Sequence, residues 1–411
     1  MTALDEVWSK FRELANPTEP IEVSLAEAVG LVLAEPVIAD VDLPPFDRAA
    51  ADGYAVRAED AHPGALLRVI SPPLDDDPEF EIDAGESALV EAGGPLPLGA
   101  DSVLTIEQIR SEAGSGGPRV IEVLERAIVG RGVSERGTLL EAGDLLLDAG
   151  TRLEPAMVGL LAAQGCVHPI CRRRVRVALL AVGDHLVGPS EAPILHRERN
   201  AANLAVTALL LRTGAMIHDL GAVAERDAGP ALDRATTAPL VIVLGAFTGG
   251  LLRRLAHDGV EPVITGVDLA PASEFQYGLI RDEEGRPAAH LLHCSLDPVE
   301  AVVQTALFAL PLIDCLQGRG SDHGPARVEA LWLGDPAAER RACLARLRVD
   351  RSTRLVAEPL EPRGRGDLAT LARANAVALP PEIHPDTGEL VASIIPLGEI
   401  ADPCREHVSL R

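Results

Sequence analysis

Residues 175–186 read VRVALLAVGDHL, and this stretch decides the fold. Its unbroken run of Val, Ala and Leu is typical of a strand buried on both faces, and Gly183 and Asp184 are turn residues that end it. Residues 200–214 follow as NAANLAVTALLLRTG, an apolar helix that Gly214 stops. A buried strand that leads into a helix of this kind is the repeating unit of an α/β fold.

The same alternation continues toward the carboxyl terminus. We expect further strands at 216–223, 239–245, 262–267 and 289–294, and helices at 229–237, 251–259 and 298–310. Strands and helices that alternate in this way predict a central doubly wound parallel sheet, with helices on both of its faces. A sheet of this type forms a ligand crevice where the carboxyl ends of its strands meet.

The chain before this sheet has a different pattern. Amphipathic spacing predicts a helix over 3–15, and Ser24 with Glu27 has the spacing of a capping box for a second helix over 25–34. Residues 50–149 alternate short β-type runs with Gly, Pro and Asp turns. That pattern predicts an inserted all-β domain, a small barrel or a sandwich, and a helix at 155–165 follows it.

Beyond the sheet, residues 318–325 (GRGSDHGP) have the composition of a linker, and the short β-type runs after it predict a C-terminal small β-barrel domain. The whole chain is therefore expected to be an α/β multidomain protein. Its expected parts are an elongated N-terminal helical and extended linker domain (1–49 plus 150–172), the inserted β domain (50–149), the α/β domain (173–317) and the C-terminal β domain (326–411).

Composition narrows the class of protein. The chain has 411 residues, of which 47% are hydrophobic and only 2% aromatic, so its cores must be built from Ala, Val, Leu and Ile. There are 62 acidic against 37 basic residues, a formal net charge of −25, and no basic stretch typical of a nucleic-acid-binding protein. Lys10 is the only lysine, so every other basic residue is an arginine.

Three features predict a cytoplasmic protein without membrane association. The 6 cysteines contain no CxxC pair, which is typical of reduced thiols. The first residues carry an acid at Asp5 and lack the apolar run of a signal peptide. The longest apolar stretch, 301–313, is interrupted by Gln304 and Pro311, and we expect no membrane-spanning segment.

Four segments resemble, in order, the motifs of one family. They are DLPPFDRAAADGYAV (42–56), GGPLPLGADSVLTIE (93–107), RGTLLEAGDLLLDAGTRL (136–153) and VRVALLAVGDHL (175–186). They are similar to segments of the molybdopterin molybdenumtransferase family, which includes MoeA and the E domain of gephyrin. The inserted β domain and the β/α pattern match the plan of that family as well.

The resemblance implies an activity and partners. Members of this family bind adenylylated molybdopterin, hydrolyse it with a divalent metal and insert molybdate at the dithiolene. It implies molybdopterin or the molybdenum cofactor as the ligand. It also implies a homodimer, or a heterodimer with an active paralogue, and a molybdoenzyme as a client.

The resemblance also assigns candidate site residues. Asp52 and Asp184 match acids of the family and are the candidate catalytic residues, although Asp52 is equally well explained as a turn residue before Gly53. Positions matching ligand-binding motifs are Gly183, His185, Asn200, Gly245, Thr248, Gly250, Asp297 and Pro298. Glycines and helix starts of this kind let backbone N–H groups approach an anion.

Other family positions are replaced. Thr138 and Leu139 stand where the family has two acids, and His185, a poor ligand for Mg²⁺, stands where it has Glu. Residues 270–278 match a segment with two lysines, and this chain has neither. Arg253 replaces an acid, and together with Arg254 it forms either a solvated helix face or a phosphate clamp.

A separate possibility is a soft-metal site. His290, His293 and Cys294 lie close in sequence and could join His185 at the crevice, but each is more often found as an ordinary residue at a strand end or in a loop. The spacing is not diagnostic, so both interpretations stay open.

The sequence therefore predicts a molybdenum cofactor biosynthesis protein that binds molybdopterin with weak or absent molybdate-insertion activity, because each lost electrostatic group costs about two to three orders of magnitude in rate. One alternative is an inactive scaffold or partner of an active paralogue, a pseudoenzyme in this family. The other is a cleft that has been reused for another anionic small molecule.

Overall fold

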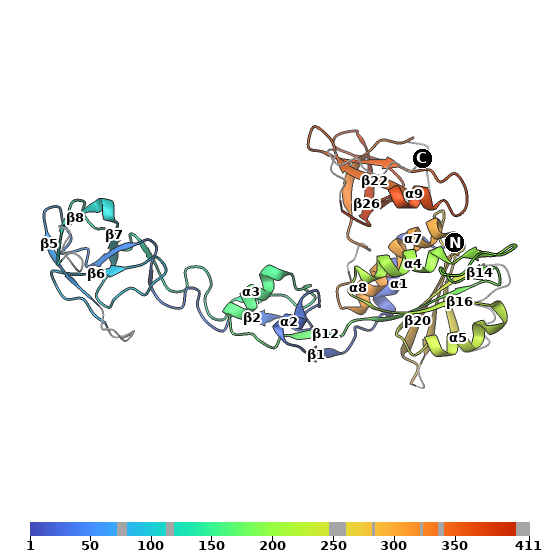
Figure 1. Cartoon of the computed structure of the whole chain (residues 1–411), viewed down its shortest axis with the longest axis horizontal. Helices are drawn as coiled ribbons and strands as arrows, with labels where there is room; N and C mark the ends of the chain where they lie inside the picture. Colours follow the sequence, from blue (N-terminus) through green and yellow to red (C-terminus); the bar gives the residue numbers. More distant parts are fainter. Residues whose placement is uncertain are drawn as a thin grey trace. The chain divides into compact units, whose positions relative to one another are not determined.

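A computed structural model describes residues 1–71, 80–111, 119–245, 260–281, 284–320, 324–335 and 341–399 (Figure 1). The chain divides into two compact units. Unit 1 consists of Met1–Ala34, Gly150–Pro155 and His168–Arg411, and unit 2 consists of Glu35–Ala149 and Ala156–Val167. Each unit is described by itself below. The finer division into four domains stays a prediction.

The main sheet of unit 1 has the strand order β16-β13-β17-β20-β19-β18. Its parallel part is made by β13 (Arg176–Val182), β16 (Met216–Val223), β17 (Leu240–Gly245) and β20 (Pro287–Cys294). The remaining strands, β18 (Val260–Thr265) and β19 (Gln276–Arg281), run antiparallel to their neighbours. The predicted α/β multidomain fold is confirmed, and the sheet is mixed.

The antiparallel part of the sheet follows from short connections. Residues 266–275 join β18 to β19, and residues 282–286 join β19 to β20. A parallel pair needs a crossover of a dozen or more residues, usually a helix, whereas antiparallel strands can be joined by a turn. The sequence pattern identified β18 and β20 but not β19 between them.

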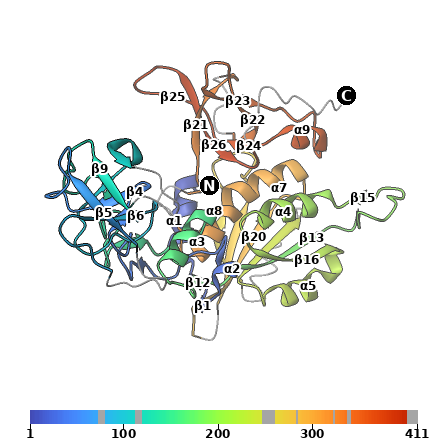
Figure 2. The same cartoon turned by 60° about the vertical axis from the view of Figure 1, so that its left-hand side comes forward.

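Helices cover both faces of the sheet, as expected for a doubly wound fold. In Figure 2, α4 (Ala201–Leu211) and α7 (Pro298–Gln304) lie together on one face, and α5 (Ala228–Ala235) lies on the other. Asn200 begins α4, and Gly214, with φ of 79°, follows its end. The predicted helix over 251–259 lies outside the described residues.

The helix that starts at Pro298 is longer than expected. It continues through a π-helical turn at Thr305–Ala309 into α8 (Leu310–Leu316). By length and composition its 19 residues could cross a membrane, contrary to the expectation from the sequence. However, 78% of its most apolar window is buried inside the protein, and a buried core helix passes the same test.

The N-terminal helix packs on this core. The amphipathic face of α1 (Leu4–Leu14) buries Val7, Trp8 and Phe11. The indole N–H of Trp8 donates to the carbonyl of Leu307 at 2.8 Å, and Phe11 meets Tyr277 edge to face at 5.0 Å between ring centroids. The helix predicted over 3–15 is therefore confirmed.

The second predicted helix is much shorter than expected. It covers only Leu25–Ala28 (α2), with the capping box of Ser24 and Glu27 in place. Gly30 follows with φ of 76°, a left-handed conformation that ends the helix. Val32 and Leu33 then form β-bridges with residues far along the chain, Arg152 and Cys171. Helical propensity is overridden here by pairing with a distant segment.

Unit 2 contains the predicted all-β insertion. Its six-stranded sheet has the order β7-β4-β6-β5-β9-β8. The strands are β4 (Gly53–Val56), β5 (Leu66–Ile70), β6 (Glu86–Val90), β7 (Ser102–Leu104), β8 (Ile109–Ser111) and β9 (Val120–Val123). The helix expected at 155–165 is α3 (Pro155–Ala163), which Gly165 follows with φ of 71°.

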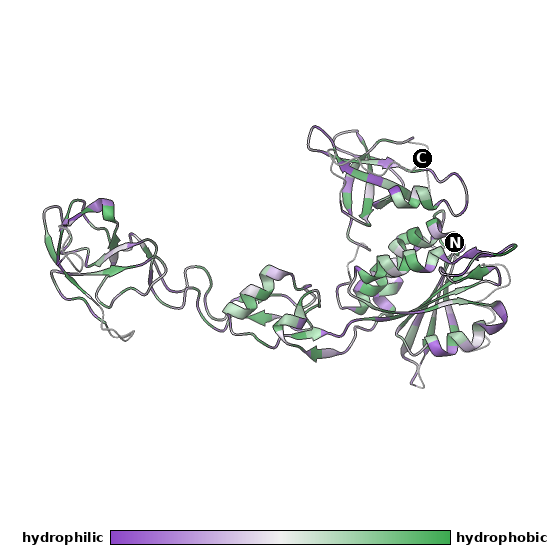
Figure 3. Cartoon of the chain, viewed as in Figure 1, coloured by the Kyte–Doolittle hydropathy of each residue, from purple (hydrophilic) through white to green (hydrophobic). Residues whose placement is uncertain are grey.

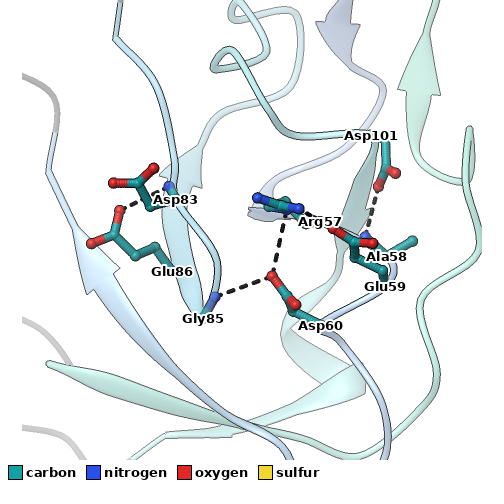
Figure 4. Close-up of polar contacts among 8 residues, drawn as sticks. All are labelled: Arg57, Ala58, Glu59, Asp60, Asp83, Gly85, Glu86 and Asp101. Carbon is teal, nitrogen blue, oxygen red and sulfur yellow. Dashed lines mark hydrogen bonds and ion pairs between the residues drawn. The ribbon is translucent and has the colours of Figure 1, made fainter.

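Carboxylates organise the turns around this sheet (Figure 4). After β4, Asp60 accepts a hydrogen bond from the N–H of Gly85 at 3.1 Å, and Arg57 pairs with Glu59 and, at 3.5 Å, with Asp60. Asp101 accepts from the N–H of Ala58 at 2.7 Å. These polar groups serve as turn partners for backbone N–H groups.

The C-terminal part of unit 1 is a small closed barrel, as predicted. Its strands are β21 (Val328–Trp332), β22 (Cys343–Val349), β23 (Leu355–Pro359), β24 (Ala376–Ala378), β25 (Glu382–Ile383) and β26 (Leu390–Pro396). β21 pairs with β23 on one side and with β26 on the other, which closes the ring. The short helix α9 (Leu368–Arg373) and β22 had no clear sequence signal.

Gly53 allows β4 and β7 to pair closely, and its replacement tests this contact. A Cβ atom at this position would lie 2.2 Å from the carbonyl oxygen of Leu104. We expect Gly53→Ala to destabilise unit 2 by about 3 kcal/mol or more in denaturant unfolding, because backbone must move.

The control is Gly159→Ala in α3, where an added methyl group meets nothing within 4 Å. This change should be neutral or stabilising by up to about 1 kcal/mol, because Ala favours helix over Gly. Equal stability of Gly53→Ala and the unaltered protein would contradict the description of this strand pair.

Candidate functional site

The carboxyl ends of the parallel strands bring most of the predicted site residues to one edge of the sheet. The first turn follows β13, where the N–H of Gly183 donates to the carbonyl of Val223 at 3.0 Å. Asp184 is exposed, and its Oδ1 accepts a hydrogen bond from the N–H of Glu225 at 3.0 Å. One carboxylate oxygen of this candidate catalytic residue is thus used to hold the neighbouring turn after β16.

His185 belongs to the same turn. Its Nε2 lies 3.3 Å from Glu198 Oε1, and both side chains are largely exposed. The strands β14 (Leu186–Val187) and β15 (Glu198–Arg199) hold the pair together. An added Cβ at Gly183 would lie 3.0 Å from His185 Cε1, so a small residue there leaves room for the imidazole.

Asn200 caps helix α4 and is buried. Its side-chain oxygen accepts a hydrogen bond from the N–H of Asn203 at 3.2 Å. Asparagine is among the best residues at this position because it satisfies an N–H group that the helix leaves open. The match with the family motif therefore has a structural explanation here, and the side chain faces its own helix.

Asp297 and Pro298 start helix α7 at the end of β20. Asp297 Oδ1 accepts from the N–H groups of Val299 and Glu300 at 3.0 and 3.1 Å, and Oδ2 accepts from the N–H of Gly366 in the barrel. Pro298 occupies the first helical position, where no N–H is needed. This carboxylate connects the sheet, the helix and the barrel.

Gly245 ends β17 beside a buried histidine. An added Cβ would lie 3.4 Å from His293 Nε2 and 3.7 Å from Val182 Cβ. The glycine thus lets the imidazole lie close to the strand end. Thr248 and Gly250, together with Arg253 and Arg254, lie outside the described residues.

The residues of the suggested soft-metal site do not converge. His290 and Cys294 are on β20 with His293 between them, and side chains of a strand alternate between its two faces. His290 Nδ1 is 2.8 Å from the hydroxyl of Tyr277. Burial lowers the pKa of His290 and of His293 to about 4, and it raises the pKa of the Cys294 thiol.

A divalent metal, which the family resemblance implies, does not fit the groups seen here. In the described ranges, no three His, Cys, Asp or Glu side chains come together as ligands. Both oxygens of Asp297 and one of Asp184 accept from backbone N–H groups. Mg²⁺ prefers an octahedral set of oxygen ligands, and this edge of the sheet does not supply one from the described residues.

A cavity of about 200 Å³ lies between this edge and the barrel. Its wall includes Pro271, Asp297 and Glu300 from the α/β part, and Arg341 and Arg365 from the barrel part. Neither arginine was predicted from the sequence, because none of the segments that resemble the family's motifs includes residues 341 or 365. The Gly-rich turn around Arg365 is a weak signal that could have drawn attention to it.

Hydrogen bonds of neighbouring residues anchor the two backbone segments that carry Arg341 and Arg365, whose side chains are exposed. The N–H of Ala342, next to Arg341, donates to the carbonyl of Ala270 at 2.8 Å. Asp367 accepts from the N–H of Arg363 and from the hydroxyl and the N–H of Thr370, and these bonds lower the pKa of Asp367 to about 2. The loop that carries Arg365 is thus fixed at both ends, by Asp367 and by the Gly366–Asp297 bond.

Asp52, the other candidate catalytic residue, lies in unit 2. Its Oδ1 accepts a hydrogen bond from the N–H of Ala92 at 2.8 Å, in the turn before β4. This contact fits the interpretation of Asp52 as a turn residue. Its catalytic role stays a prediction.

Comparisons with known proteins agree with this architecture. Residues 2–165 match the family described as the MoeA N-terminal region (domain I and II). The chain is 28% identical to a molybdopterin molybdenumtransferase of Haemophilus influenzae over 344 residues, which cover 80% of this chain and 81% of that protein. It is 29% identical to molybdopterin molybdenumtransferase 1 of Mycobacterium tuberculosis over 350 residues, 78% of this chain and 79% of that protein.

The fold has a solved counterpart. The crystal structure of a molybdopterin biosynthesis MoeA protein from Pyrococcus horikoshii matches with a TM-score of 0.77 at 23% identity, covering 96% of this chain and 100% of that one. At this identity the likeness shows the fold alone. Fold and site define a multidomain α/β protein with a crevice at the carboxyl edge of its sheet. Together with the sequence matches, they support an assignment of the chain to the MoeA family.

The buried histidines make stability depend on pH. The folded pKa of His290 is about 4, below the ordinary value of about 6.5. As the pH falls, this histidine therefore binds a proton in the unfolded chain at a higher pH than in the folded protein. The free energy of unfolding is highest above pH 6.5 and decreases as the pH falls toward 4, by up to about 3 kcal/mol. In chemical denaturation at a series of pH values, His290→Gln should show a shallower loss between these limits. Parallel curves for the two proteins would contradict the assignment.

Proposed function

We propose that this protein acts in molybdenum cofactor biosynthesis by binding molybdopterin, and that its capacity to insert molybdate is low. The family supports the pathway, because the curated relatives are named molybdopterin molybdenumtransferases. The ligand is then molybdopterin or the molybdenum cofactor, in a crevice at the carboxyl edge of the main sheet.

The observation that carries this proposal is the pair of arginines in the cavity beside Asp297. A guanidinium group presents a planar fork of N–H donors that matches a phosphate or oxyanion, and it stays charged at all relevant pH values. Arg341 and Arg365 are thus suited to the role of the lysines that the chain lacks. Binding of an anionic pterin is supported by this geometry.

Low molybdate-insertion activity is supported by the hydrogen bonds that the acidic side chains of the site already accept. Asp297 is occupied by three backbone N–H groups and Asp184 by one, so neither is free to hold a hard cation with all its oxygens. Glu300 accepts from the hydroxyl of Ser295 at 2.7 Å. Carboxylate oxygens that accept hydrogen bonds from the protein have fewer lone pairs left to coordinate a catalytic metal ion.

We also propose a dimer, formed through helix α3. This helix carries no charged residue, and only Leu161 of its nine residues is buried. In Figure 3 it shows mostly the green and pale shades of apolar and neutral residues. On a chain with a net charge of −25, an uncharged surface is where a second acidic copy can approach without repulsion. A homodimer is the expected form, and an active paralogue is the alternative partner.

The location proposed for the protein is the cytoplasm. The cysteines Cys166, Cys294, Cys315 and Cys343 are free thiols. Free thiols in a protein with several cysteines are typical of a reducing compartment. A molybdoenzyme client would receive the finished cofactor there.

Binding of molybdopterin can be tested by titration calorimetry with single arginine variants. Arg365→Ala should weaken binding about tenfold or more, because it removes a charge-assisted hydrogen bond worth about 1.5–3 kcal/mol. The matched control is Arg351→Ala, an exposed arginine of the same barrel that does not line the cavity. Equal affinity of the unaltered protein and both variants would contradict binding of molybdopterin in this cavity.

Turnover is a separate measurement. The unaltered protein, incubated with adenylylated molybdopterin, molybdate and Mg²⁺, should release AMP at least about a hundredfold more slowly than a motif-complete relative. Release at the relative's rate would show that the lost lysines and acids are not needed. No binding and no release, with a stable complex to an active paralogue, would favour a scaffold.

A further inference from the structure

A second crevice lies on the opposite face and half of the sheet from the cavity described above. Helix α5 has 8 residues and is about 12 Å long, whereas β16 also has 8 residues but extends about 26 Å. The helix contributes Ala228, Ala231 and Leu232 to one apolar cluster with Leu180 and Val182 of β13. A crevice of about 650 Å³ is lined by Arg176 and Ala178 of β13, by residues 216–220 of β16 and by the carboxyl end of α5.

The floor of this crevice is apolar. Ala178, Ala235 and Ala238 line it and are almost fully buried. Met216, at the start of β16, lines it with an exposed side chain. Small residues on the floor leave room for a ligand body. The volume is in the range of sites for small molecules, about 300–1,000 Å³.

Three cationic or hydrogen-bonding side chains surround the floor: Arg176, His218 and Arg234. Arg176 is the partner of Met216 across β13 and β16, and Ala178 is the partner of His218. Alternation along the strands therefore puts Arg176 and His218 on the same face as the floor. Arg176 Nη2 donates to the carbonyl of Thr237 at 3.0 Å, which fixes its guanidinium at the rim.

Asp219 is the acidic residue among those that line the crevice, and its carboxylate has other partners. Asp219 is next to His218 on the strand and so points to the other face, where it accepts from Asn203 Nδ2 of α4 and from the N–H of Gly221 at 2.8 Å. The crevice lies at the carboxyl end of α5, which is the negative pole of a helix. There, the carbonyls of Asp233 and Arg234 accept from the hydroxyls of the two threonines that follow the helix.

We propose that this crevice binds a small organic anion that has an apolar body. The acidic head, a carboxylate, sulfonate or phosphate ester, would pair with Arg234 and Arg176 at the rim, and the body would cover the alanine floor. The site is separate from the one proposed for molybdopterin, because it lies at the amino-terminal half of β13 and β16. Its local positive charge stands out on a chain of net charge −25.

The probe for the test is anilinonaphthalene sulfonate, which joins an aromatic body to an acidic head and fluoresces in apolar surroundings. The full chain should bind it in a saturable titration, and Arg234→Glu should weaken this binding at least about tenfold through the lost ion pair and the added repulsion. The matched control is Arg226→Glu, an exposed arginine outside the crevice whose partner is Asp227 at 3.4 Å. The control should bind as the unaltered protein does.

Two competing ligands distinguish the contribution of the acidic head from that of the apolar body. Hexanoate should displace the probe at a much lower concentration than inorganic phosphate, because only hexanoate covers the apolar floor. Equal displacement by both would overturn the apolar part of the proposal. Equal binding of the probe by Arg234→Glu and Arg226→Glu, or no saturable binding at all, would overturn the site itself. In that case the charges only protect the free edge of β16 from pairing.

Because Arg234 is exposed, its replacement should leave the fold intact. Unchanged thermal unfolding of Arg234→Glu makes its loss of binding informative. A second variant, Ala238→Leu, fills the space above the apolar floor and keeps all the charges. This variant should also weaken binding of the probe. Retained binding in Ala238→Leu would contradict a ligand that occupies the floor.

Discussion

One carboxylate joins the parts on which the proposed site depends. Asp297 stands where β20 ends and α7 begins, and its oxygens accept from two N–H groups of the helix and from Gly366 in the barrel. A buried or half-buried polar group must be satisfied, so this arrangement fixes the barrel loop against the sheet edge. The cavity that Arg341 and Arg365 line includes this carboxylate in its wall.

The acids at this edge of the sheet already accept hydrogen bonds from the protein backbone, and this is one reason to expect little molybdate-insertion activity. A carboxylate that accepts several backbone hydrogen bonds has fewer lone pairs left to coordinate a metal ion. Asp184 and Asp297 both hold backbone turns. The arginines retain positive charge in the cavity, so binding of an anion and loss of turnover are compatible properties of one site.

Local patterns in the sequence predicted the elements whose neighbours are close in the chain. The buried strand β13, the helix that Asn200 caps and the apolar helix from Pro298 all follow from periodicity and capping residues. The helix predicted over 25–34 failed where Val32 and Leu33 pair with Arg152 and Cys171. Such pairing depends on contacts more than a hundred residues away, which a local pattern does not contain.

The candidate site was predicted in part for the same reason. Parallel strands must end at a common edge, so Gly183, Asp184, Gly245 and Asp297 could be expected to lie at one edge of the sheet. The arginines of the barrel come to that edge only through tertiary contacts, the Gly366–Asp297 bond and the Ala342–Ala270 bond. Counting lysines therefore underestimated the positive charge available to an anion.

Diffraction from crystals grown with molybdopterin tests the central claim most directly. The account predicts ligand density in the cavity beside Asp297, with the acidic groups of the pterin within hydrogen-bonding distance of the guanidinium groups of Arg341 and Arg365. A pterin bound elsewhere on the chain, with water alone between these arginines, would contradict it.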